Sequence, residues 1–189
     1  MHPLVTGIGA AKPIEGVTCA PHPSPAIAMP LEIERKFLVT SDAWRAQASK
    51  RVEMAQAYLN DLATLDAGAM NVSVRVRIQG TEAFLNMKSR ELGTTRQEFD
   101  YRIPVDDARA LLKLSVGGKI EKVRHYVEFG GRTFEVDEFL GDNVGLVVAE
   151  LELDDADAAY ERPEWLGEEV TDQPRYYNLA LASRPYSAW

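Results

Sequence analysis

Seven short segments of the sequence alternate apolar residues with charged or polar ones, and this period of two is the strongest constraint on the fold. Successive side chains of a β-strand point to opposite faces of the sheet, so residues two apart share a face. In segment 72–78, Arg75 and Arg77 share one face, while valine and isoleucine occupy the other. The pattern recurs in 31–39, 84–88, 98–103, 121–127, 134–139 and 149–153. It predicts an antiparallel sheet with one apolar and one charged face.

The charged positions are mostly doublets of like charge. Glu32 and Glu34 share a face with Lys36, and Arg75 shares one with Arg77. An ordinary antiparallel sheet also alternates, with its polar face in water. Doublets that converge in an enclosed space need opposite charges or a bound ion, because isolated buried charges cost many kcal/mol. Carboxylates are ligands for Mg²⁺ or Mn²⁺, and arginine binds phosphate through paired hydrogen bonds. The pattern therefore indicates a wet polyphosphate site, with a structural ion-pair network as the alternative.

The order of these motifs resembles the CYTH domain of the triphosphate tunnel metalloenzymes. Its hallmark Glu-x-Glu-x-Lys corresponds to Glu32, Glu34 and Lys36, and the likeness runs from about residue 29 to the C-terminus. The size and the ending Glu-Val-Thr…Arg-Tyr-Tyr-Asn are most similar to small bacterial inorganic triphosphatases. The resemblance implies an α+β fold, a closed eight-stranded antiparallel β-barrel with helices packed on its outside.

The resemblance also implies roles for individual residues. The expected ligands of Mg²⁺ or Mn²⁺ are Glu32, Glu34, Asp137, Glu150 and Glu152. The expected phosphate-binding residues are Lys36, Arg75, Arg77, Lys88, Lys122 and Arg124. The residues expected to be catalytic are Glu32, Glu34 and Lys36. A second group comprises Glu98, Asp100, which is shorter than the glutamate that relatives often carry, and Arg175, which follows a proline.

The implied activity is metal-dependent hydrolysis of a triphosphate, with inorganic tripolyphosphate yielding pyrophosphate and phosphate. Three alternatives stay open at this point. The chain could hydrolyse thiamine or nucleoside triphosphates, act as a class IV adenylate cyclase, or bind polyphosphate without catalysis. The implied partner is a small polyphosphate molecule, and the protein is expected to be a monomer or homodimer.

Charge, cysteine content and proline content bear on the binding partners, the compartment and the domain boundaries. The 189-residue chain has a formal net charge of −8, which argues against general binding of nucleic acid or anionic membranes. A single cysteine, Cys19, allows no internal disulfide and fits a reducing cytoplasm. Residues 1–28 are rich in proline and lack periodicity, so we expect a disordered leader before a domain at 29–189.

Strands are expected near 30–39, 51–60, 71–79, 82–90, 95–103, 119–129, 131–138 and 146–153. Helices are expected at 41–44, 105–114, 154–160 and 176–183, and a turn at 163–167. Gly130-Gly131 indicates a tight hairpin. His125 has the apolar parity of its strand, which predicts packing rather than catalysis.

Overall fold

A computed structural model describes residues 33–89, 97–155 and 157–189. The expected leader at 1–28, Glu32 and the 90–96 segment lie outside the described residues. The described chain forms one sheet of nine strands in the order β5-β4-β3-β2-β6-β7-β8-β1-β9. The strands are β1 (Ile33–Val39), β2 (Ala48–Tyr58), β3 (Val72–Gln79), β4 (Glu82–Ser89), β5 (Glu98–Ile103), β6 (Val116–Phe129), β7 (Arg132–Phe139), β8 (Val147–Leu153) and β9 (Leu166–Glu169).

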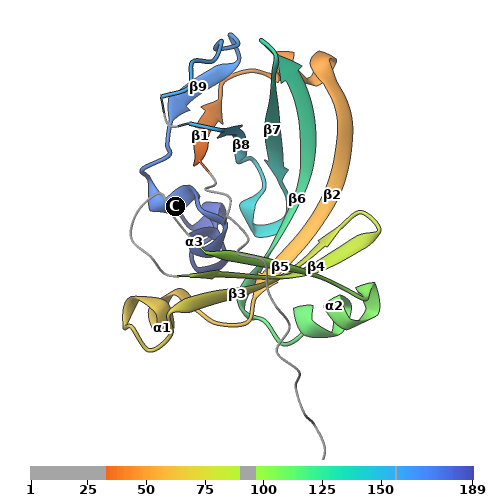
Figure 1. Cartoon of the computed structure of the whole chain (residues 1–189), viewed down its shortest axis with the longest axis vertical. Coiled ribbons are helices and arrows are strands. Elements are labelled where there is room, and N and C mark those ends of the chain that lie inside the picture. The colour runs from red at the N-terminus through yellow and green to blue at the C-terminus, as the bar shows by residue number, and fades with distance from the viewer. Residues whose placement is uncertain (1–32, 90–96, 156) are drawn as a thin grey trace, which may run out of the picture.

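The sheet is open, so the prediction of a closed eight-stranded barrel is wrong. β5 and β9 are its edge strands, and the described residues contain no pairing between them. β1 is flanked by β8 and β9, both antiparallel to it, so neither of its edges is free to close the sheet on β5. The sheet nevertheless curves strongly, with β3, β4 and β5 crossing below the long strands β2 and β6 (Figure 1).

Short helices complete the fold. They are α1 (Leu62–Asp66), α2 (Val105–Leu112) and α3 (Asn178–Ser183), with the short 3₁₀ helices η1 (Asp42–Gln47), η2 (Gly141–Asn143), η3 (Pro174–Tyr176) and η4 (Tyr186–Ala188). The described part contains no helix long and apolar enough to cross a membrane. α2 and α3 lie on opposite sides of strands β3 to β5 (Figure 1).

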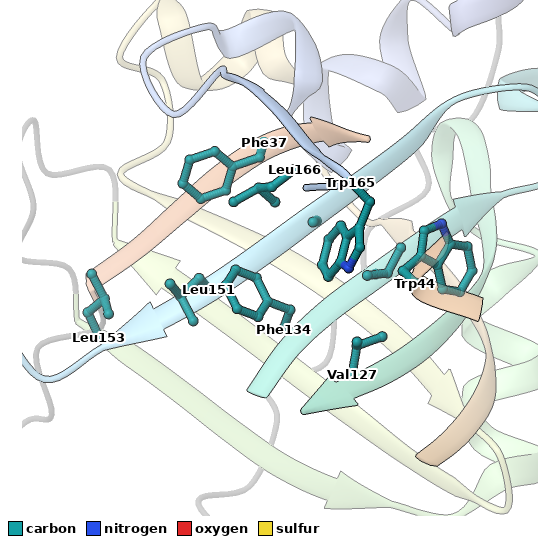
Figure 2. Close-up of a cluster of buried hydrophobic side chains, with 10 residues drawn as sticks. Phe37, Trp44, Val127, Phe134, Leu151, Leu153, Trp165 and Leu166 are labelled. Atoms are coloured by element: carbon teal, nitrogen blue, oxygen red, sulfur yellow. The ribbon is translucent and has the colours of Figure 1, made fainter. Parts of the chain in front are cut away.

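The apolar face of strands β1, β6, β7 and β8 carries the larger hydrophobic cluster. Phe134 packs edge-on against Trp165 with ring centroids 5.5 Å apart, and both are buried. Trp44, from η1, packs against His125 at 4.7 Å, which confirms that this histidine is a packing residue. Figure 2 shows labelled side chains of this cluster, Trp44, Phe134 and Trp165 among them, gathered over the sheet. The members of the cluster are Phe37, Trp44, Val127, Phe134, Val136, Ala149, Leu151, Leu153, Trp165 and Leu166.

A second cluster lies on the opposite face, at one end of the sheet. Leu181 and Ala182 of α3 pack there against Tyr58, Ile120 and other buried residues. Helices were expected to pack on the apolar outside of the sheet. α3 instead packs on the face that carries the charged doublets. The cause is local, because that face is apolar at its end, where Ile120, Phe139 and Val148 replace charged residues.

Two smaller expectations have opposite outcomes. The Gly130-Gly131 hairpin is confirmed, since both glycines have positive φ values of 58° and 73° between β6 and β7. The helix expected at 154–160 is wrong for the described residues of that segment, which form bends, a turn and irregular backbone. The Asp155 side chain accepts a hydrogen bond from the backbone N–H of Asp157 at 2.8 Å. Such a local bond favours a turn over a helix.

Candidate functional site

Strand register places the predicted charged residues on one face of the sheet. Directly opposite residues of paired strands share a face. Lys36 lies opposite Glu150, Arg124 opposite Asp137, and Lys88 opposite Glu98. Continued across all the pairs, this register defines a charged face that comprises Glu34, Lys36, Arg75, Arg77, Lys88, Glu98, Asp100, Lys122, Arg124, Glu135, Asp137, Glu150 and Glu152.

Lys36 joins two of the expected metal ligands. Its ammonium donates to Glu34 Oε1 at 2.8 Å and also to Glu150. The Lys36 side chain is only 4% exposed, and burial lowers its pKa, but the attraction of Glu150 and Glu34 outweighs burial and raises the pKa. Lys36 therefore stays protonated over the physiological range and cannot serve as a base.

Arg124 and Lys122 both bind Asp137, which is fully buried. Arg124 donates from Nε to Asp137 Oδ1 at 2.7 Å and from Nη2 to Oδ2 at 2.6 Å, a bidentate geometry. Lys122 donates to the same carboxylate. Arg124 also donates to Glu135 and Glu150. The oxygens of Asp137 are thus already occupied by cations.

Arg75 and Arg77 on β3 are less completely neutralised. Arg77 Nη2 donates to Asp100 Oδ2 at 3.2 Å. Burial, followed by the nearby positive charge of Arg75, lowers the pKa of Arg77 despite that bond. The buried Nε atoms of Arg75 and Arg77 have no hydrogen-bond partner among the described residues. A bound anion would relieve both the repulsion and the missing acceptors.

The outer strands supply the remaining residues of the charged face. Lys88 forms an ion pair with Glu98 at 2.9 Å, and Glu98 also accepts a hydrogen bond from Asn86. Asp100 forms an ion pair with Arg77, so its short side chain neutralises a guanidinium in this structure. Both acids of the second group therefore lie beside expected phosphate-binding residues.

Glu34 and Glu152 are the more open carboxylates. They lie directly opposite each other on β1 and β8, and both are exposed, unlike Glu150 and Asp137. Within the described ranges, no group of three or more acidic, histidine or cysteine residues is arranged to hold a metal ion. A hard cation is commonly bound by one or two carboxylates plus substrate phosphates. The Glu34–Glu152 pair fits that mode.

Arg175 is not part of the sheet and contacts aromatic rings. Its guanidinium carbon lies 4.8 Å from the centroid of Tyr176 and 5.0 Å from that of Trp189. Two residues that the sequence analysis did not single out touch Lys36 instead. Thr171 Oγ1 accepts a hydrogen bond from the Lys36 backbone N–H at 3.0 Å, and the Tyr177 ring centroid is 5.7 Å from Lys36 Nζ. Their only sequence signal was the Glu-Val-Thr…Arg-Tyr-Tyr-Asn ending.

Comparison with known proteins identifies the family of the chain. The family model described as the CYTH domain matches residues 30–186. An inorganic triphosphatase of Acetivibrio thermocellus is 44% identical over 156 residues, which cover 82% of this chain and 95% of the relative. An inorganic triphosphatase of Nitrosomonas europaea is 38% identical over 154 residues, which cover 80% of this chain and 96% of the relative.

A solved structure supports the same relationship. The crystal structure of an inorganic triphosphatase has a TM-score of 0.61 and 35% identity, covering 80% of this chain and 93% of the solved chain. The family model spans well over half of the sequence and both relatives exceed 30% identity over most of their length. The chain belongs to the CYTH domain family.

Proposed function

We propose that the protein hydrolyses inorganic tripolyphosphate to pyrophosphate and phosphate with the help of Mg²⁺ or Mn²⁺, and that the charged face is its site. The observation that carries the proposal is the pair of buried, partnerless Nε atoms on Arg75 and Arg77. They lie on the same face as Glu34 and Glu152. Guanidinium groups suit phosphate oxygens, and carboxylates suit a hard cation. The names of the two relatives favour the same substrate.

Each side of the charged face has its own part in this proposal. Arg75, Arg77 and Lys88 bind the phosphoryl oxygens and neutralise their charge. Arg124 and Lys122 extend the positive lining toward β6, held in place by Asp137. Arginine residues aimed at developing charge stabilise a phosphoryl-transfer transition state without having to reorganise.

Glu34 and Glu152 would hold the divalent cation, with Glu150 beside them. The ion would polarise the phosphoryl oxygens and lower the pKa of the attacking water. Water attacks the terminal phosphorus, the bond from that phosphorus to the bridging oxygen breaks, and pyrophosphate leaves. Lys36, kept protonated by Glu34 and Glu150, would stabilise negative charge on the departing or terminal phosphate. Asp137 serves as a counter-charge to Arg124 and Lys122 rather than as a ligand.

A phosphate-release screen tests the substrate. The purified protein is given tripolyphosphate, pyrophosphate, ATP or thiamine triphosphate, each with Mg²⁺, with Mn²⁺ or with EDTA. The proposal expects release from tripolyphosphate with either metal at a kcat/KM at least tenfold above the others, and no release with EDTA. Faster turnover of thiamine triphosphate or ATP would replace the assigned substrate. Tight binding of tripolyphosphate with no release under any metal would indicate a binding module.

A further inference from the structure

Gln56 lies among the residues assigned to phosphate binding, although it is neutral. It sits on β2, directly opposite Arg77 on β3 and opposite Ile120 on β6. Register therefore places its side chain on the charged face, beside Arg77 and diagonally from Arg75. The residue is only 1% exposed, and it is among the largest fully buried side chains.

The amide nitrogen of Gln56 has no acceptor. Nε2 is buried and has no hydrogen-bond partner in the described part of the chain. Leaving a buried donor unpaired costs about 1–3 kcal/mol, so native proteins rarely keep one without a reason. Arg75 Nε and Arg77 Nε, on the adjacent strand of the same face, lack acceptors too. Three neighbouring positions thus each carry a buried N–H donor that lacks an acceptor, as expected of a site shaped for an oxygen-rich anion.

Other partnerless donors do not share this setting. Trp44 Nε1 and Trp165 Nε1 belong to side chains of the apolar cluster on the opposite face. For an indole there, burial of the ring outweighs the loss of one hydrogen bond. A glutamine offers no comparable apolar surface, and leucine would fill the Gln56 position without the penalty. The buried amide of Gln56 is therefore best explained by a polar ligand that accepts its hydrogen bonds.

We propose that Gln56 is a phosphate-binding residue that donates its amide N–H groups to a phosphoryl oxygen held between Arg75 and Arg77. This inference rests on the proposed function of the charged face. A neutral amide suits the position because it adds two donors without adding repulsion between guanidinium groups that already lower the pKa of Arg77. A lysine or a third arginine there would increase that repulsion.

Binding of tripolyphosphate tests the role separately from catalysis. Isothermal titration in EDTA measures the Kd for the wild type, Gln56→Leu and Gln56→Glu, and thermal unfolding of the ligand-free proteins measures stability. Met54→Leu is the matched control, because Met54 is buried two residues away on the same strand and face. Loss of a hydrogen bond to a charged group predicts a Kd about ten- to a hundredfold higher for Gln56→Leu. The free Gln56→Leu protein should melt at the wild-type temperature or above it.

The outcomes separate this inference from the proposed function. Gln56→Glu preserves the shape but repels the anion, so it should weaken binding more than Gln56→Leu. Wild-type affinity in Gln56→Leu, or equal weakening in Met54→Leu, would overturn the role of Gln56 alone. If the wild type neither binds tripolyphosphate in EDTA nor releases phosphate from it with Mg²⁺ or Mn²⁺, the proposed function falls and the role of Gln56 falls with it. If it releases phosphate only with the metal, KM for tripolyphosphate with Mg²⁺ replaces Kd in the same comparison of variants. Should Gln56→Leu fail to fold, Gln56→Met removes the same donors and is judged by the same criterion.

Discussion

Lys36 on β1 and Glu150 on β8 are cross-strand partners joined by a buried ion pair. Burial raises the pKa of Glu150, but Lys36, Arg124 and Lys122 more than offset it, so the pKa lies well below 4.5. A carboxyl whose pKa is lower in the folded than in the unfolded state stabilises the fold at pH values above its unfolded pKa. That stabilisation is lost as the pH falls through the folded pKa. The pair therefore contributes to folding at neutral pH and not in strong acid.

Replacing Glu150 by Gln should destabilise the protein more at pH 7 than at pH 3, because the contribution of the carboxylate begins to be lost as the pH falls below its unfolded pKa. At neutral pH the change leaves Lys36 and Arg124 with fewer counter-charges, at a cost of about 1–3 kcal/mol. Thermal unfolding followed by circular dichroism at both pH values measures the difference. Glu152→Gln is the control, since Glu152 is exposed two residues along the same face. Equal losses for Glu150→Gln at both pH values would contradict the assignment.

A second pair of variants tests whether Glu34 binds the metal and whether Asp137 acts as a counter-charge. Glu34→Gln should raise the Mg²⁺ concentration needed for half-maximal activity by about tenfold or more, because an exposed carboxylate ligand is lost. Asp137→Asn should leave that concentration nearly unchanged while raising KM for tripolyphosphate, because Arg124 and Lys122 lose their anchor. Metal titrations of initial rate decide between them. A large metal shift in Asp137→Asn alone would reverse the two assignments.

A matched glycine pair tests the β6–β7 turn. Both Gly130 and Gly131 have positive φ, so alanine at either is strained by roughly 1 kcal/mol. A Cβ at Gly130 would lie 2.8 Å from Glu161 Cβ, whereas at Gly131 it would meet nothing within 4 Å. Gly130→Ala should therefore lower the melting temperature more than Gly131→Ala. Identical melting temperatures would show that the Glu161 contact has no energetic effect.

Arg175 should matter for stability rather than for turnover. Its guanidinium packs against the rings of Tyr176 and Trp189, which is worth about 0.5–1 kcal/mol at an exposed site. Arg175→Gln should therefore lower the melting temperature slightly and leave kcat/KM for tripolyphosphate within twofold. Steady-state rates and thermal unfolding check both. A tenfold fall in kcat/KM would return Arg175 to the candidate site.

Much of the charged face could be predicted because alternation along a strand determines which of its side chains share a face. Arg75 and Arg77 fall on one face whatever their neighbours are, and pairing with β2 and β4 then aligns them with Gln56 and Asn86. Closure of the sheet could not be predicted this way, since alternation says nothing about which strand becomes an edge. The turn expected at 163–167 is confirmed at residues 164 and 165, but β9 begins at Leu166 and was not predicted, because a four-residue strand containing Gly167 leaves almost no periodic signal.

Other features depend on contacts that distant segments make. Thr171 reaches the Lys36 backbone only because the 170–177 segment lies along β1, where Val170 N–H also bonds to Lys36 O at 2.7 Å. Asp137 has the parity of a metal-side carboxylate, but Arg124 and Lys122 occupy its oxygens from the neighbouring strand. Gln56 carries no charge, so its importance emerges only from its burial and its missing acceptor.

The central claim is that the charged face of the sheet binds the triphosphate, and Arg75→Lys and Arg77→Lys test it most directly. Lysine keeps the charge but cannot form the paired hydrogen bonds of a guanidinium. Each variant should lower kcat/KM for tripolyphosphate about ten- to a thousandfold, or roughly 1.4–4 kcal/mol. The melting temperature of the free protein should change little. Full activity in both lysine variants would mean that these arginines only balance the carboxylates, and that the triphosphate binds elsewhere.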